Sequence, residues 1–247
     1  MRRSNARGRL TVVPPIAPFL RLLLLLLSLA VLPATAVAEA VDLELVLCVD
    51  ASGSVSDDEY DLQLTGLAAA FRDSAVQSAI TSGPRGRVAV ALVVWADAST
   101  PKDKSDWHVL DGAAAAERFA RVVERFPRRV EGGTGIGSAV AFSVSYIETN
   151  DIQSSRKVVD VSGDGIETPV RAEISMLLPA ARNMAAARDV VLNGLAITNE
   201  VHNLDDYYRD NLMLGPDSFV MTAPNYAAFK IAIREKLLRE IAARVAL

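Results

Sequence analysis

The feature that most constrains this chain is an apolar segment ending abruptly in oxygen-bearing side chains, residues 41–54 (VDLELVLCVDASGS). Residues 43–49 are apolar almost without interruption, which predicts a β-strand covered on both faces. Asp50, Ser52 and Ser54 then occupy alternate positions. An unpaired carboxylate beside a core is costly, so these side chains need partners. Three such groups at the carboxyl end of a strand are typical of half a site for a hard cation.

Further apolar segments alternate with helical patterns along the rest of the chain. Strands are predicted at 87–95, 157–161, 190–197 and 218–221, with a short edge strand at 107–110. Helices are predicted after the capping box at Ser56, at 113–126, after 132–140, at 172–188 with a break at Pro179, and after the cap residue Asn225. This alternation predicts an α/β fold, a Rossmann-like three-layer αβα arrangement with a mainly parallel sheet and helices on both faces. No repeat or second core is evident, so residues 39–247 are predicted to form a single domain.

The first 38 residues have the pattern of a cleavable signal peptide. Basic residues precede the apolar run at 22–32, and small residues precede a cleavage point after Ala38. The apolar run is shorter than the roughly 20 residues of a membrane-spanning helix. We therefore expect an exported protein, periplasmic in a Gram-negative cell and otherwise secreted. The alternative is an uncleaved anchor, in which case membrane contact would occur only through this segment.

The charge balance argues against two classes of partner, and the cysteine count excludes an internal disulfide. Residues 1–38 hold five arginines and no acid, which leaves 21 basic residues against 30 acidic ones, a balance of −9 for the remainder. A chain this acidic is a poor general binder of nucleic acid or anionic membranes, so neither partner is expected. Cys48 is the single cysteine, so an internal disulfide is excluded, and its place in an apolar strand indicates a packing role.

Two downstream motifs supply further oxygen ligands. Thr134 lies within the glycine-rich segment 132–137 (GGTGIG), and Asp164 lies within SGDG at 162–165. In open α/β sheets, ligands bind beyond the carboxyl ends of the strands, so these groups are expected to meet Asp50 and its serines there. Hydroxyl and carboxylate oxygens suit Mg²⁺ or Mn²⁺, with Ca²⁺ as a further candidate. Taken singly, the serines and the threonine fit ordinary turn and cap roles equally well.

DASGS at 50–54, GGTGIGSAV at 132–140 and VVDVSGDG at 158–165, on these elements and in this order, resemble the von Willebrand factor A-type (vWA) domain and its metal-ion-dependent adhesion site, MIDAS. The resemblance implies a six-stranded sheet with one short antiparallel edge strand. It also implies that Asp50, Ser52, Ser54, Thr134 and Asp164 hold the metal, the last two directly or through water. The closing segments 204–220 (LDDYYRDNLMLGPDSFV) and 230–242 (KIAIREKLLREIA) look like those of exported bacterial proteins of unknown function.

Asp160 departs from the family pattern, because it places an acid inside the strand that leads to Asp164. It either orients a metal ligand from behind or is a buried acid with a structural partner, and we favour the structural role.

The resemblance implies a non-catalytic module that binds a divalent cation and, through it, an Asp or Glu carboxylate of a protein partner. One alternative is a Mg²⁺-dependent phosphohydrolase with Asp50 as nucleophile. Such enzymes commonly place an acid two residues after the nucleophile, where this chain has Ser52, which cannot act as a general acid at neutral pH. A degenerate interaction domain that works without metal is a further alternative.

Overall fold

A computed structural model of the chain describes residues 39–168 and 176–242. The predicted signal peptide lies outside the described residues, which all belong to one compact unit, Ala38–Leu247. The strands are β1 (Glu39–Val41), β2 (Leu43–Asp50), β3 (Val88–Trp95), β4 (Asp103–Lys104), β5 (His108–Leu110), β6 (Ile152–Ser154), β7 (Lys157–Gly163), β8 (Val190–Ile197) and β9 (Val220–Ala223). The helices are α2 (Asp57–Arg72), α3 (Ser74–Ile80), α4 (Ala113–Glu124), α5 (Ile136–Glu148), α6 (Leu178–Ala186), α7 (Leu204–Asn211) and α8 (Tyr226–Ile241).

The main sheet has the order β4-β3-β2-β7-β8-β9, and its five long strands all run parallel. At one edge, β4 and β5 both pair antiparallel with β3, β4 against its last residues and β5 against its first. The seven named strands therefore occupy six positions, and the predicted antiparallel edge strand is confirmed as a strand interrupted between residues 104 and 108.

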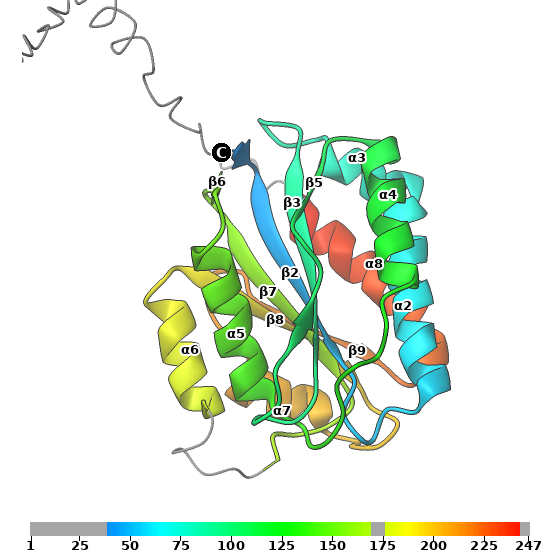
Figure 1. Ribbon diagram of the computed structural model, residues 1–247, viewed down its shortest axis with the longest axis vertical. Helices are drawn as coiled ribbons and strands as arrows, with labels where there is room; N and C mark the ends of the chain where they lie inside the picture. The colour runs from blue at the N-terminus through cyan, green and yellow to red at the C-terminus, as the bar shows by residue number, and fades with distance from the viewer. Residues whose placement is uncertain (1–38, 169–175, 243–247) are drawn as a thin grey trace, which may run out of the picture. The chain divides into compact units, whose positions relative to one another are not determined.

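Helices cover both faces of the sheet, with α5, α6 and α7 on one side and α2, α3, α4 and α8 on the other (Figure 1). This three-layer arrangement explains why β2 and β3 are buried at every residue. Along β2, Leu45 and Leu47 pack in the α2–α4–α8 layer, whereas Val46 and Cys48 pack in the α5–α6–α7 layer. The mainly parallel α/β fold predicted from the alternation of elements is confirmed.

Several local predictions differ from the structure in their details. Pro179 does not divide a helix over 172–188, because α6 begins one residue before it, where a missing backbone N–H is tolerated. Residues 169–175 lie outside the described residues. The short parallel pair of β1 and β6 was not predicted, since three-residue strands carry too little periodicity to be recognised.

The caps of α2 and α8 agree with the sequence. Ser56 and Glu59 form a reciprocal capping box at the start of α2. The side chain of Asn225 accepts a hydrogen bond from the backbone N–H of Ala228 at the start of α8. Both helices therefore begin where the sequence places them, next to the carboxyl ends of the strands.

Candidate metal centre

Three loops meet at the carboxyl edge of the sheet: the serine loop (51–56) after β2, the threonine loop (125–135) before α5, and the aspartate loop (164–168) after β7. The N–H of Gly53 donates to the carbonyl of Gly132 at 2.8 Å, which ties the serine loop to the threonine loop. The N–H of Thr168 donates to the carbonyl of Thr134 at 2.8 Å, which ties the threonine loop to the aspartate loop. Backbone hydrogen bonds thus bring together all three segments singled out in the sequence.

Asp50 is the last residue of β2 and is completely buried. Its Oδ1 accepts a hydrogen bond from the N–H of Ser52 at 2.7 Å, whereas its Oδ2 is buried and has no hydrogen-bond partner among the described residues. Burial raises the pKa of Asp50 to about 7 in the absence of a cation. A buried carboxylate oxygen without a partner is costly, and a bound cation would remove that cost.

A chain of hydrogen bonds links the two serines to Asp164. The hydroxyls of Ser52 and Ser54 lie 3.3 Å apart, and Ser54 Oγ donates to Asp164 Oδ1 at 2.7 Å. Asp164 and Ser52 are buried, but Ser54 is exposed at the surface. The arrangement therefore joins a buried pair of carboxylates to a hydroxyl that a partner molecule can reach.

Thr134 lies beside this chain of groups and is not bonded into it. Its Oγ1 is 3.2 Å from the place where a β-carbon on Gly165 would be, which puts the threonine side chain against the aspartate loop. No hydrogen bond joins it to the other four predicted ligands within residues 39–168 and 176–242. Its backbone is fixed from both sides, because the N–H of Thr134 also donates to Thr168 Oγ1 at 2.9 Å.

Gly135 brings the threonine loop close to the loop after β3. A β-carbon on Gly135 would lie 2.5 Å from the backbone nitrogen of Ala98. Gly135 N–H also donates to the carbonyl of Ala96 at 3.0 Å. The glycine therefore places the threonine loop against the end of β3.

Four residues that support the site were not recognised in the sequence: Gln63, Arg128, Glu167 and Tyr226. Gln63 Nε2 donates to the carbonyl of Asp50 at 2.9 Å, and Tyr226 donates to Asp164 Oδ2 at 3.0 Å. Glu167 Oε2 accepts from the N–H of Gly137 in the first turn of α5, and burial raises the pKa of Glu167 to about 7. Only Tyr226 carried a signal, because it follows the recognised cap Asn225 at the end of a strand.

Asp160 belongs to a different cluster. It lies in the middle of β7, and its Oδ1 is 2.7 Å from Nζ of Lys236 on α8, which also contacts Glu240. Burial and then the negative charge of Glu240 raise the pKa of Asp160. These are the contacts of a buried, ion-paired acid, and they join Asp160 to α8.

The donor set at the sheet edge is made of oxygen alone. It combines the carboxylates of Asp50 and Asp164 with the three hydroxyls, and within the described ranges no group of three His, Cys, Asp or Glu side chains forms a metal site. Such a set fits Mg²⁺ or Mn²⁺ better than a softer metal.

Comparison with models of protein families identifies the family of this chain. A family model described as "Protein of unknown function (DUF1194)" matches residues 40–245. The chain belongs to the DUF1194 family. A search among curated proteins finds no match.

Solved structures show that this DUF1194 chain has the vWA fold. The pilus adhesin SpaC from Lactobacillus rhamnosus GG aligns with a TM-score of 0.57 and 13% identity, over 81% of this chain and 31% of SpaC. The vWF domain of the type V pili tip protein Mfa5 from Porphyromonas gingivalis aligns with a TM-score of 0.56 and 11% identity, over 84% of this chain and 98% of that domain. Proximal thread matrix protein 1 from the mussel byssus, in a structure with a zinc-occupied MIDAS motif, aligns with a TM-score of 0.57 and 17% identity, over 82% of this chain and 46% of the mussel protein.

The DUF1194 chain thus spans about a third of SpaC and just under half of the mussel protein. In the part of the chain that the structure describes, no helix is long and apolar enough to cross a membrane.

Proposed function

We propose that this protein is a non-catalytic, metal-dependent binding module that recognises a carboxylate of a protein partner. Asp50, Ser52, Ser54, Thr134 and Asp164 would hold a divalent cation, Mg²⁺ or Mn²⁺ first and Ca²⁺ as a further candidate. When bound, the cation would offer a Lewis-acidic position for one oxygen of an Asp or Glu side chain of the partner.

The observation that carries this proposal is Oδ2 of Asp50. It is a buried carboxylate oxygen without a hydrogen-bond partner among the described residues, at the carboxyl end of β2 where the predicted ligands meet. Asp164, by contrast, has both oxygens occupied by Ser54 and Tyr226. The asymmetry supports a cation held first by Asp50 and the two neighbouring hydroxyls, with Asp164 acting through Ser54 or through water.

Each residue has a distinct task in this proposal. Asp50 supplies negative charge at the floor of the site, and its backbone is fixed by Gln63. Ser52 and Ser54 supply neutral oxygens, so the site carries few charges and leaves the cation electrophilic towards an outside carboxylate. Ser54 is exposed and marks the side from which the partner would approach.

The same geometry argues against a phosphohydrolase. A nucleophilic carboxylate must reach its substrate, but Asp50 is completely buried. The position two residues after Asp50 is occupied by a serine whose hydroxyl faces Ser54, and no general acid is placed there. Two proteins with the same fold are named as an adhesin (SpaC) and as a matrix protein (the mussel protein). These names support a binding function more than an enzymatic one.

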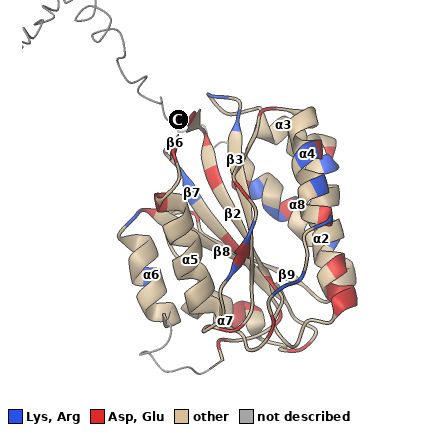
Figure 2. Cartoon of the chain, viewed as in Figure 1, with Lys and Arg blue, Asp and Glu red and all other residues tan. Residues whose placement is uncertain are grey.

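The proposed setting is outside the cytoplasm, periplasmic or secreted. It is supported by the signal-peptide pattern of residues 1–38 and by the pilus proteins among the similar structures. Acidic side chains gather at the start of α2 and of α7 (Figure 2), and the proposed site lies among the loops at that end of the sheet. A partner would therefore present its carboxylate in a neutral or basic surround.

A pull-down from an extracytoplasmic extract tests the proposal. Immobilised protein should retain a partner in Mn²⁺ buffer and release it on chelation, and Asp50→Asn should retain none. Asp58→Asn is the matched control, because Asp58 is an exposed acid in the first turn of α2. Retention that survives both the chelator and Asp50→Asn would contradict metal-dependent binding.

A further inference from the structure

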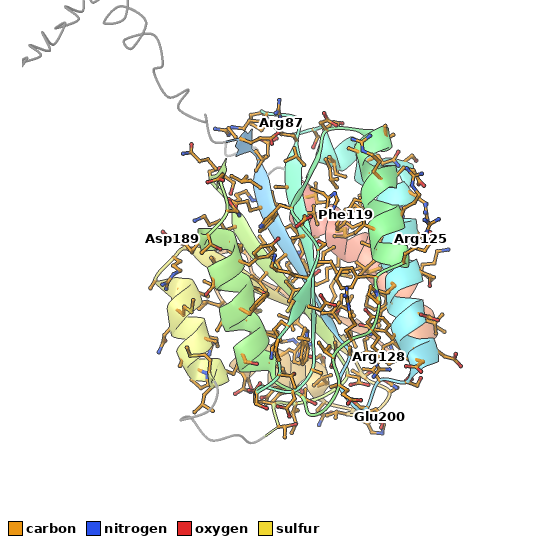
Figure 3. All side chains as sticks on the ribbon, in the orientation of Figure 1. Arg87, Phe119, Arg125, Arg128, Asp189 and Glu200 are labelled. Carbon is orange, nitrogen blue, oxygen red and sulfur yellow. The ribbon has the colours of Figure 1, made fainter. Side chains whose placement is uncertain are left out.

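Arg128 lies directly behind the serine loop. It follows α4 and Pro127 in the threonine loop, and its side chain is only 20% exposed. Figure 3 shows Arg128 at the carboxyl end of the sheet, close to the first turn of α2. A guanidinium so well covered needs acceptors for its N–H groups, because it cannot lose its charge.

Those acceptors are three carbonyl oxygens of the serine loop. Nη2 of Arg128 lies 3.1 Å from the carbonyl oxygen of Ala51, 3.1 Å from that of Ser52 and 2.7 Å from that of Val55. Nη1 donates to Asp57 Oδ1 at 2.7 Å, at the start of α2. One side chain therefore binds the serine loop along its length and fixes it to the helix that follows.

These contacts determine which way the loop presents its groups. The carbonyl oxygens are directed to Arg128, while the hydroxyl of Ser54 is directed to Asp164 and the N–H of Ser52 to Asp50. The loop is thus held from two sides, by Arg128 behind it and by the carboxylates in front. Without Arg128, three carbonyl groups lose their charged donor, and the backbone of residues 52–54 is then held through its N–H groups, that of Ser52 on Asp50 and that of Gly53 on Gly132.

We infer that Arg128 is a positioning residue for the metal centre, which holds Ser52 and Ser54 in the ligating arrangement and so sets the affinity for the cation. This inference rests on the proposed function. Groups that orient metal ligands from behind typically change metal affinity by about 10–100-fold when they are removed.

Charge and geometry make opposite predictions for this residue. A positive charge near the site repels a cation, so a role through charge alone predicts that a neutral residue at 128 strengthens cation binding. The pairing of Arg128 with Asp57 already offsets that charge. The positioning role predicts weaker binding even when the charge is kept, because a lysine ammonium cannot reproduce the planar, forked donor of arginine.

The test is calorimetric titration of Mn²⁺ into the full chain and into Arg128→Lys, Arg128→Met and Arg129→Lys. Arg129 is the matched control: it is the next residue, its side chain is 64% exposed, and it pairs with Asp103 and not with the serine loop. We expect the Mn²⁺ dissociation constant to rise roughly 10–100-fold in both Arg128 variants and to stay within about threefold in Arg129→Lys.

Amide hydrogen exchange in chelator gives a second, metal-free measurement. The amides of residues 52–56 should exchange faster in Arg128→Lys than in the wild type, while those of β7 remain unchanged, which separates release of the loop from global unfolding. If the wild type binds Mn²⁺ and Arg128→Lys binds it equally well, the positioning role is overturned and the proposed function stands. If the wild type, correctly folded, binds no Mn²⁺, the proposed function fails and this inference fails with it.

Discussion

Replacement of Lys236 by methionine should show how much the buried cluster of Asp160, Lys236 and Glu240 contributes to the stability of the protein. Lys236 is fully buried, with its ammonium between Asp160 of β7 and Glu240 one turn further along the same helix. The ammonium nitrogen also lies over the ring of Phe219, 4.8 Å from the ring centroid. Methionine keeps the apolar length of the side chain and removes only the charge, so the loss should be electrostatic.

The size of the loss follows from the two carboxylates that remain. Breaking a buried ion pair by removing one partner typically costs about 3–5 kcal/mol of unfolding free energy. That is a large share of the roughly 5–15 kcal/mol that stabilises a typical domain. For a domain of this size it corresponds to a fall in melting temperature of about 6–20 °C.

The pH dependence of the loss has a definite sign. Burial already raises the pKa of Asp160 above its unfolded value, so its ionisation makes the folded state less stable as pH rises through the folded-state pKa. Without Lys236, Asp160 should hold its proton to still higher pH. For each additional proton that the folded variant binds, its free energy of unfolding falls by a further amount of about 1.4 kcal/mol, or 2.303RT, for every pH unit of increase. The destabilisation should therefore be small at pH 5 and larger at pH 8.

Urea denaturation followed by circular dichroism at pH 5 and pH 8 measures both quantities. Lys230→Met is the matched control, since Lys230 is exposed on the same helix and should change stability little. A loss of less than about 1 kcal/mol at pH 8, or an equal loss at both pH values, would refute the account of this cluster.

Two further substitutions test the site itself. Gly163→Ala should destabilise the protein by about 1–3 kcal/mol and weaken Mn²⁺ binding, because its β-carbon would lie 2.7 Å from Asp50 Oδ2. Gly53→Ala, whose β-carbon meets only a carbonyl oxygen at 3.4 Å, should be tolerated, and equal effects in urea unfolding would contradict the packing argument. Tyr226→Phe should cost about 1.5–3 kcal/mol, because it removes the hydrogen bond to buried Asp164. Unchanged urea unfolding of Tyr226→Phe would show that this bond contributes nothing.

Much of the fold could be predicted because parallel strands buried on both faces have a distinctive sequence. Residues 43–50 and 88–95 are buried throughout and are apolar in almost every position, so both strands were placed to within a residue. The short pair of β1 and β6 escaped prediction, because its three residues per strand pair through backbone contacts that leave no side-chain pattern.

The candidate ligands could be named from the sequence because they sit at the ends of recognisable strands, but their supports could not. Arg128 contacts the serine loop across more than 70 residues of chain, and in the sequence it only marks the end of a helix. Asp160 could not be assigned from spacing, since its partner Lys236 lies on the last helix. Long-range contacts of single polar side chains have no periodic signature, and the structure is needed to find them.

The most direct test of the central claim is electron paramagnetic resonance of Mn²⁺ added to the purified protein. The account predicts that the free-Mn²⁺ signal is suppressed up to one equivalent in the wild type and in Asp58→Asn, and that it is not suppressed in Asp50→Asn. A wild-type protein that leaves the free-Mn²⁺ signal unchanged, or an Asp50→Asn variant that suppresses it equally, would contradict the assignment of a metal centre at this edge of the sheet.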